Sequence, residues 1–348
     1  MRGKCGLFHT SYAQEARFFQ TGFLKFSLGL FFIALLCTPL YLSNYQLSML
    51  NMINIAVIGA VALNLLTGCC GQISLGHGAF IGVGAYATGL CSLAGWPFIP
   101  ALLFGGLVTA LVGMIFGVPS LRLKGIYLAI ATLAAQLILS YVFMHWESMT
   151  GGSVGLGLDA PAICGLALDS DAKMFYLTLT VAVFSVLLVS NILRTRHGRA
   201  FVAIRDFHQS AESVGVNLFS YKLQAFAVSS FLAGISGGLW AHYTMYITPE
   251  QFDILLSIRY LAMIIIGGMG SVLGSIFGAV FVTLLPEGLG ALAQWAGAFF
   301  PNISTYFLAM REGIFGLILV LFLIFEPEGL VHRWRLIKAY WKLYPFAY

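Results

Sequence analysis

The chain contains no aspartate, glutamate, lysine or arginine between Phe26 and Leu121. In an ordinary soluble domain about a quarter of the residues are charged. Over all 348 residues only 9% are charged and 59% are hydrophobic, too few charges to cover a soluble surface. In lipid, by contrast, apolar side chains face outward without cost, provided that the backbone groups are paired within helices. We therefore expect an all-α, polytopic transmembrane helical bundle.

Apolar runs of about 20 residues, the length that crosses a bilayer, set the number of spans. The run 254–285 is too long for one simple span, and the short run 288–300 is either a further span or a re-entrant segment. The count is eight to ten, with ten preferred. The first run is a span rather than a signal peptide, because it lacks a small-residue cleavage site. The runs are 24–42, 46–66, 72–94, 99–118, 125–146, 174–193, 223–246, 254–285 and 305–325.

Basic residues gather at the borders of these runs, whereas the segment 147–172 carries acidic residues and no lysine or arginine. Because lysine and arginine favour the cytoplasmic side, 147–172 is predicted to be an outer loop and 194–222 a cytoplasmic one. The predicted units are a cytoplasmic tail 1–23, a transmembrane domain 24–328 and a basic cytoplasmic tail 329–348 that contacts anionic lipid. Basic residues at membrane borders do not form the solvated face that nucleic acid requires. The clusters are Arg2, Lys4, Arg17 and Lys25; Arg122 and Lys124; Arg194, Arg196, Arg199, Arg205 and Lys222; and Arg333, Arg335, Lys338 and Lys342.

The largest cytoplasmic loop contains a helical pattern. Ile204, Phe207, Ala211 and Val214 recur at spacings of three, four and three, which predicts one apolar helical face. Gly215 follows where a left-handed C-terminal cap is expected. Two interpretations stay open: the helix lies on the lipid surface, or it is offered to a cytoplasmic partner.

The same loop carries a family resemblance. Gln209-Ser210-Ala211 followed by Gly215 resembles the "EAA…G" loop of ABC-importer permeases, with glutamine and serine in place of the acidic residue and the first alanine. The surrounding "GRAFVAIRD" resembles the corresponding loop of the branched-chain amino-acid permeases. The segments "GQISLGHGAFIGVGAY", "LRLKGIYLAIATLA", "TGGSVGL" and "LAMIIIGGMGSVLGSIFGA" follow that family's order, so the resemblance covers roughly 50–330. It is closer to the longer of the family's two permease subunits.

The resemblance implies a permease subunit of an ATP-driven importer for amino acids of the leucine, isoleucine and valine class. It also implies a second permease subunit, two cytoplasmic ATPase subunits and a soluble binding protein outside a bacterial inner membrane, with both termini of this chain cytoplasmic. The sequence has no GxxxxGK[ST] loop. We therefore expect no enzymatic activity, cofactor or metal in this chain, and ATP and Mg²⁺ bound by the partner ATPases. The expected ATPase-coupling residues are Gly198, Arg199, Ile204, Arg205, Asp206, Gln209, Ser210, Ala211 and Gly215.

Two glycine-rich segments lie in the expected spans, one in each half of the chain. Ser74, Gly78 and Gly82 form a ridge of small residues at intervals of four, and Gly270, Gly274 and Gly278 form a second one. The pair Gly267–Gly268 is expected to break or bend its helix. Two interrupted segments are typical of an inverted repeat with the pathway between its halves, although packing alone explains both ridges. The residues expected to line the pathway or its gate are Gln72, Ser74, His77, Gly78, Gly82, Thr150, Gly151, Gly152, Ser153, Gly267, Gly268, Gly270 and Gly274.

His77 is the one strongly polar, titratable side chain in the uncharged stretch. Three interpretations stay open. A metal site with Cys69 and Cys70 has no standard ligand spacing. A structural histidine would need a hydrogen-bond partner because of its burial cost, and an ionisable group beside a water-filled pathway would need the same niche. If the helix starts at Gly71, His77 lies about two turns from the cytoplasmic end, which favours a gate or a packing pivot there.

The stretch "TGGSVGLG" after the fifth span permits a tight backbone. It is either a surface turn or part of the outer opening beneath a binding protein, whose basic residues would meet the acidic residues of loop 147–172. No Asp or Glu in the first four spans could hold an ammonium group, so urea and short amides are alternative solutes. A secondary transporter or an intramembrane enzyme would need paired intramembrane carboxylates, which the spans lack, and neither explains the cytoplasmic helix.

Overall fold

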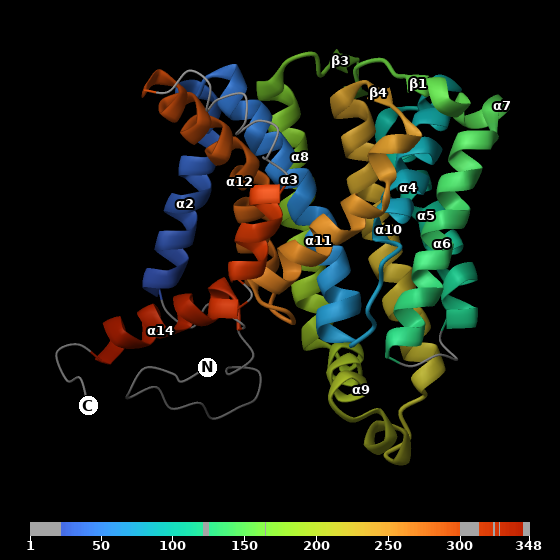
Figure 1. The fold of residues 1–348 in the computed structure, drawn as a ribbon, viewed down its shortest axis with the longest axis vertical. Coiled ribbons are helices and arrows are strands. Elements are labelled where there is room, and N and C mark those ends of the chain that lie inside the picture. The colour runs from blue at the N-terminus through green and yellow to red at the C-terminus, as the bar shows by residue number, and fades with distance from the viewer. Residues whose placement is uncertain are drawn as a thin grey trace.

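The structure is a computed structural model that describes residues 22–120, 125–163, 165–299, 313–322, 324–326 and 328–343. Within these ranges it is a bundle of helices, which confirms the all-α expectation (Figure 1). The helices are α2 (Gly22–Tyr41), α3 (Asn44–Leu63), the π-helix η1 (Asn64–Cys69), α4 (His77–Leu93), α5 (Phe98–Ser120), α6 (Ile126–His145), α7 (Glu147–Thr150), η2 (Gly152–Val154), α8 (Asp171–Arg194), α9 (Arg196–Ser213), α10 (Leu218–Thr244), η3 (Pro249–Phe252), α11 (Ile254–Gly267), α12 (Val272–Phe299) and α14 (Leu330–Leu343).

Four strands of two residues each form two antiparallel pairs, β1 with β4 and β2 with β3. In the first pair Leu156 lies opposite Ile247. All four strands lie at one end of the bundle, which we call the strand end, and α9 protrudes from the other, which we call the α9 end (Figure 1). The strands are β1 (Leu156–Gly157), β2 (Ala162–Ile163), β3 (Leu166–Ala167) and β4 (Tyr246–Ile247).

Six helices in the described ranges are long and apolar enough to cross a membrane. They correspond to the predicted second, fourth, fifth, sixth and seventh spans and to the second part of 254–285. The predicted third span is wrong as a single helix, because α4 begins only at His77 and has 17 residues. The run 254–285 is two helices, α11 and α12, since the predicted break at Gly267–Gly268 is present. Shorter apolar helices are Gly29–Tyr41, Ile254–Gly267 and Gly313–Phe322.

Short polar side chains start several of the helices. The Ser43 hydroxyl accepts a hydrogen bond from the backbone of Gln46, and the Gln46 side chain accepts one from the Ser43 backbone. This reciprocal capping box pairs two backbone N–H groups that would otherwise lack partners at the start of α3. Ser170, Asn217 and Asp253 cap α8, α10 and α11 in the same position. The caps fix where these helices begin after a loop.

The helices differ in how much of their surface is buried inside the bundle. α10 packs against α4 and α5, and α3 packs against α8, α10 and α12. Most of the α3–η1 span and of α10 is buried, whereas most of α8 and α12 faces outward. On α5 an outward stripe at intervals of four is apolar (Leu103, Leu107, Leu111 and Ile115). An exposed apolar stripe on a polytopic helix is a lipid-facing surface.

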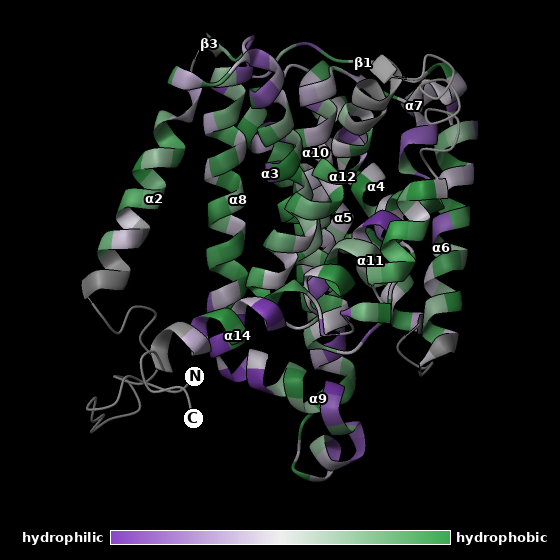
Figure 2. Cartoon of the chain, turned by 60° about the vertical axis from the view of Figure 1, so that its left-hand side comes forward, coloured by the Kyte–Doolittle hydropathy of each residue, from purple (hydrophilic) through white to green (hydrophobic). Residues whose placement is uncertain are grey.

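Polar residues concentrate at the ends of the bundle. Figure 2 shows predominantly hydrophobic spans, with hydrophilic residues concentrated on α9 and α14. The start of α2, α9 and α14 all lie at the α9 end, and α14 lies across the direction of the spans (Figure 1). The basic loop 194–222 and α14 therefore lie at one end of the bundle and the described part of 147–172 lies at the other, whereas the membrane orientation of the two termini stays a prediction. The tail 1–21 and the basic residues Arg122 and Lys124 lie outside the described residues.

Candidate functional site

The first interrupted span lies between η1 and α4. The segment 71–76 has no helix, and α4 begins at His77. This non-helical segment carries the chain from η1 toward the middle of the bundle (Figure 1), so the first turns of the predicted helix are absent. His77 therefore lies much deeper than predicted. The predicted ridge fails at its first member, since Ser74 is not on the helix.

The start of α4 lies halfway along α6. The backbone N–H of Ala79 donates to Gln136 Oε1 over 2.8 Å, and Gln136 lies near the middle of α6 (Ile126–His145). Gln136 Nε2 donates to the carbonyl of Phe252 over 2.7 Å. The Ser257 hydroxyl accepts from the N–H of Gly78 over 2.7 Å and donates to Gln136 Oε1 over 3.1 Å. A helix that begins inside a membrane must pair its first N–H groups with protein, and side chains of α6 and α11 do so here.

The second half of the chain approaches the same point from the opposite end. After β4 the chain runs inward to Phe252, whose carbonyl is bonded at the middle of α6, and α11 begins there. A Cβ on Gly78 would lie 2.8 Å from the carbonyl oxygen of Asp253, so the starts of α4 and α11 touch. The Asp253 carboxylate caps α11, accepting from the N–H of Leu256 over 3.0 Å. Two half-helices that begin in the interior suit the predicted inverted repeat, which stays a prediction.

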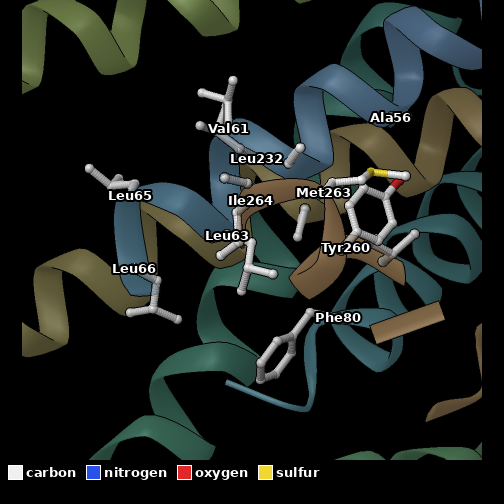
Figure 3. Close-up of a cluster of buried hydrophobic side chains, with 14 of the residues drawn as sticks. Ala56, Val61, Leu63, Leu65, Leu66, Phe80, Leu232, Tyr260, Met263 and Ile264 are labelled. Atoms are coloured by element: carbon white, nitrogen blue, oxygen red, sulfur yellow. The ribbon is translucent and has the colours of Figure 1, made fainter. Parts of the chain in front are cut away.

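His77 is held by protein groups. Its Nε2 lies 2.9 Å from the carbonyl oxygen of Gly59 in α3, and its ring meets that of Tyr260 edge-on at 5.2 Å. A Cβ on Gly59 would lie 2.5 Å from the Tyr260 ring, so only glycine leaves room for it. Figure 3 shows Tyr260 beside Met263 and Ile264 in the buried cluster next to α3. The partner that a buried histidine requires is thus the Gly59 carbonyl, and a gating role stays a prediction.

The extended segment presents its polar side chains inward. Gln72 and Ser74 are 2% and 0% exposed, whereas Ile73 between them is 40% exposed. Gln72 Oε1 and Ser74 Oγ have no hydrogen-bond partner within the described part of the chain. Leu75 N–H donates to the Thr132 hydroxyl of α6 over 2.9 Å. The alternation is therefore that of a strand with a polar inner side and an apolar outer side.

The second interruption separates α11 from α12. Gly268 and Gly270 have φ of +116° and +77°, a backbone conformation that only glycine adopts readily. A Cβ on Gly274 or Gly278 would collide with the backbone of α11, so these residues permit the close approach of the two helices. Gly270 precedes α12, which begins at Val272, so the predicted second ridge holds only for its last two members.

Asn64 joins the two interruptions. It opens η1 and is 1% exposed. Its Oδ1 accepts from the N–H of Gly270 over 2.8 Å, and its Nδ2 donates to the carbonyl of Ser271 over 2.9 Å. A Cβ on Gly68 would strike both Asn64 and Gly270. The end of the first interrupted span and the α11–α12 break are therefore one hydrogen-bonded unit.

The predicted cytoplasmic helix is α9, but its predicted apolar face is only half buried. Ile204 and Ala211 are both 4% exposed, whereas Phe207 and Val214 are 75% and 81% exposed. The reason is a kink: Phe207 has φ −150° and ψ 88°, so two helical pieces meet there and the regular spacing does not continue. Gly215 has φ +89°, which confirms the predicted left-handed cap.

The other predicted coupling residues have different surroundings. Gly198 is buried against the backbone of Leu193 with no room for a Cβ, and Arg199 donates to the carbonyl of Arg194 over 3.3 Å. Gln209 and Ser210 are exposed. Arg205 instead extends from α9 toward the spans, and its Nη1 donates to the carbonyl of Gly68 over 3.0 Å.

The predicted outer-loop residues Thr150, Gly151, Gly152 and Ser153 lie at the strand end, away from the place where α4 and α11 begin. Thr150 is buried and its hydroxyl donates to the carbonyl of Phe143 at the end of α6 over 2.7 Å. Gly151 and Gly152 have φ of +71° and +58°, which confirms the tight turn, and Ser153 is exposed.

Asn64, Gln136, Ser257 and Asp253 were not predicted. The signal that would have found the first two is an amide side chain within an otherwise apolar span.

Residues 45–323 match the protein family described as branched-chain amino acid transport system / permease component. The chain belongs to this family. The permease is 29% identical over 338 residues to the high-affinity branched-chain amino acid transport system permease protein LivM of Salmonella typhimurium (strain LT2), covering 88% of this chain and 75% of LivM. It is 28% identical to the LivM of Escherichia coli (strain K12) with the same coverage. The autoinducer 2 import system permease protein LsrC of Enterobacter sp. (strain 638) is 28% identical over 74% of the permease and 75% of LsrC.

Proposed function

We propose that this permease is the membrane-spanning subunit of an ATP-driven importer in the bacterial inner membrane, with the α9 end cytoplasmic. The observation that carries the proposal is the exposure of Phe207 and Val214 on a polar helix that protrudes from the bundle. Exposed apolar side chains surrounded by polar ones are typical anchors for a protein partner. Two ATPase subunits that bind ATP and Mg²⁺ are the partners that this surface would serve.

The second permease subunit would face the extended segment. Gly71 and Ile73 are exposed, and the segment lies between α6 and α11 on one side of the bundle. Non-helical backbone at membrane depth requires protein or water against it, since lipid cannot pair its N–H and C=O groups. We therefore place the pathway on this face, between the two permease subunits.

The proposed solute is a small neutral amino acid of the leucine, isoleucine and valine class, as for the LivM relatives. An extracytoplasmic binding protein would deliver it to the strand end, where acidic side chains are exposed (Glu147, Asp159, Asp169 and Glu250). Basic residues of the binding protein complement such a surface.

The test is to purify the complex from its own cells through an affinity tag on this chain, as wild type and as Val214→Glu. We expect an ATP-hydrolysing subunit to copurify with wild type and to be lost from the variant, because a carboxylate at an apolar contact loses its hydration without a partner. Val154→Glu is the matched control, since Val154 is 73% exposed at the strand end. Equal recovery of the ATPase with Val214→Glu and Val154→Glu would contradict the proposal.

A further inference from the structure

Two nitrogens of the Arg205 guanidinium donate hydrogen bonds to other protein groups. Nε donates to the carboxylate of Asp206 over 2.9 Å, and Nη1 donates to the Gly68 carbonyl over 3.0 Å. The Arg205 side chain is 37% exposed, so one edge faces solvent and the other enters the span. The guanidinium is planar with its donors in a fixed fork, so these two bonds also fix its orientation. α9 is therefore attached to the last turn of η1 by a rigid group.

The same guanidinium lies against both interrupted spans. A Cβ on Gly270 would lie 2.8 Å from Arg205 Nη1 and 3.1 Å from the Gly68 carbonyl oxygen. A Cβ on Gly71 would lie 3.0 Å from Arg205 Cγ. Glycine at these positions lets the arginine reach the backbone of the first interruption and of the α11–α12 break at once.

Neither interruption has a helical hydrogen-bond ladder to hold its shape. The positive φ angles of Gly71 and Gly270 (+73° and +77°) mark them as points where the chain turns without side-chain constraint. A few residues at the ends of elements are the usual hinges when packed helices move. Asn64 bonds the two interruptions together, so a displacement of one displaces the other.

We propose that Arg205 is the positioning residue through which a displacement of α9 moves both interrupted spans. This inference rests on the proposed function, in which α9 is bound by an ATPase that closes on ATP. Pulling α9 away from the bundle draws the Gly68 carbonyl with it, and Asn64 transfers that shift to the α11–α12 break. The extended segment that follows Gly68 then changes position in the pathway.

The test is hydrogen exchange of the complex, purified through a tag on this chain, with and without ATP and vanadate. In wild type, nucleotide is expected to change the exchange of 70–76 and 268–271 at least twofold. In Arg205→Ala, the ATPase still copurifies and α9 stays protected, but neither segment responds. Arg196→Ala is the matched control, because Arg196 is exposed at the start of α9 and is not among the expected coupling residues. It should respond as wild type.

A nucleotide response of both segments in Arg205→Ala equal to wild type would overturn the inference, as would no response in wild type. Loss of the ATPase from Arg205→Ala would make Arg205 a docking residue instead, and the proposed function would stand. Absence of any ATPase from the wild-type complex would refute the proposed function. If Arg205→Ala does not fold, Arg205→Lys decides: it keeps one donor nitrogen and the charge but not the planar fork. A response at least twofold weaker is then expected, and an unchanged response contradicts the inference.

Discussion

The imidazole of His77 and the carbonyl of Gly59 join the first residue of α4 to the last quarter of α3, with 2.9 Å between Nε2 and the oxygen. A carbonyl oxygen only accepts hydrogen bonds, so His77 Nε2 carries the hydrogen. The ring is 1% exposed and rests on Tyr260. His77 thus fixes the depth at which α4 begins.

His77→Gln should preserve function, because the glutamine amide nitrogen can take the place of Nε2. Leucine uptake by cells carrying this variant is expected to keep the wild-type pH profile between about pH 5.5 and 8, the range in which an unperturbed histidine titrates. His77→Ala should lower the unfolding free energy by about 1–3 kcal/mol, since a buried hydrogen bond is lost. A pH profile that flattens in His77→Gln would show that protonation of the imidazole governs transport.

Gln136→Leu should destabilise the permease by about 1–3 kcal/mol, because the N–H of Ala79 and the carbonyl of Phe252 lose a buried partner. Ser140→Ala is the control, since its hydroxyl accepts a longer bond of 3.3 Å from Gln136. Thermal unfolding of both variants in the same detergent is the measurement. Equal melting temperatures would mean that the α4–α6 contact does not contribute to stability.

Gly278→Ala and Gly288→Ala compare two glycines of α12. A Cβ at position 278 collides with the backbone of Met263, whereas at position 288 nothing lies within 4 Å. We expect about 1–3 kcal/mol of destabilisation from overpacking in Gly278→Ala and a change within about 0.5 kcal/mol in Gly288→Ala. Similar unfolding curves for the two would contradict the close packing of α11 on α12.

The ion pair between Arg333 of α14 and Glu326 should weaken at acid pH. The hydrogen bond from Arg333 lowers the pKa of the Glu326 carboxyl below its ordinary value of 4.5, and the charges of Arg333 and His332 add to this. A lowered pKa in the folded state means that the stabilisation is complete above about pH 4.5 and is lost as pH falls through the lower folded-state pKa. The protection of α14 against hydrogen exchange, taken relative to the intrinsic rate at the same pH, should therefore fall below about pH 4.5 in wild type. In Glu326→Gln this protection should already be lowered at pH 7, and wild-type protection there would rule out the ion pair as the attachment.

The lipid environment and the all-helical class could be predicted from composition and apolar runs, because lipid leaves few alternatives for the backbone. The family could be predicted from its motifs. The depth of His77 could not. By sequence, Gly71 to Gly76 fit the first turns of a helix equally well, and contacts with η1, α6 and α9 hold them in a non-helical conformation. The predicted apolar face of α9 was wrong for a similar reason. The spacing of Ile204 and Phe207 predicts one face only if the helix is straight, and a periodic pattern does not indicate the kink at Phe207.

In the proposed function, ATP drives transport by this permease through α9. The most direct measurement is leucine uptake by cells that carry it, with ATP depleted while the membrane potential is kept, and with the potential collapsed while ATP is kept. We predict that uptake stops in the first condition and in Val214→Glu, and persists in the second. Uptake that survives ATP depletion and stops when the potential collapses would rule out ATP-driven transport and indicate an ion-coupled transporter.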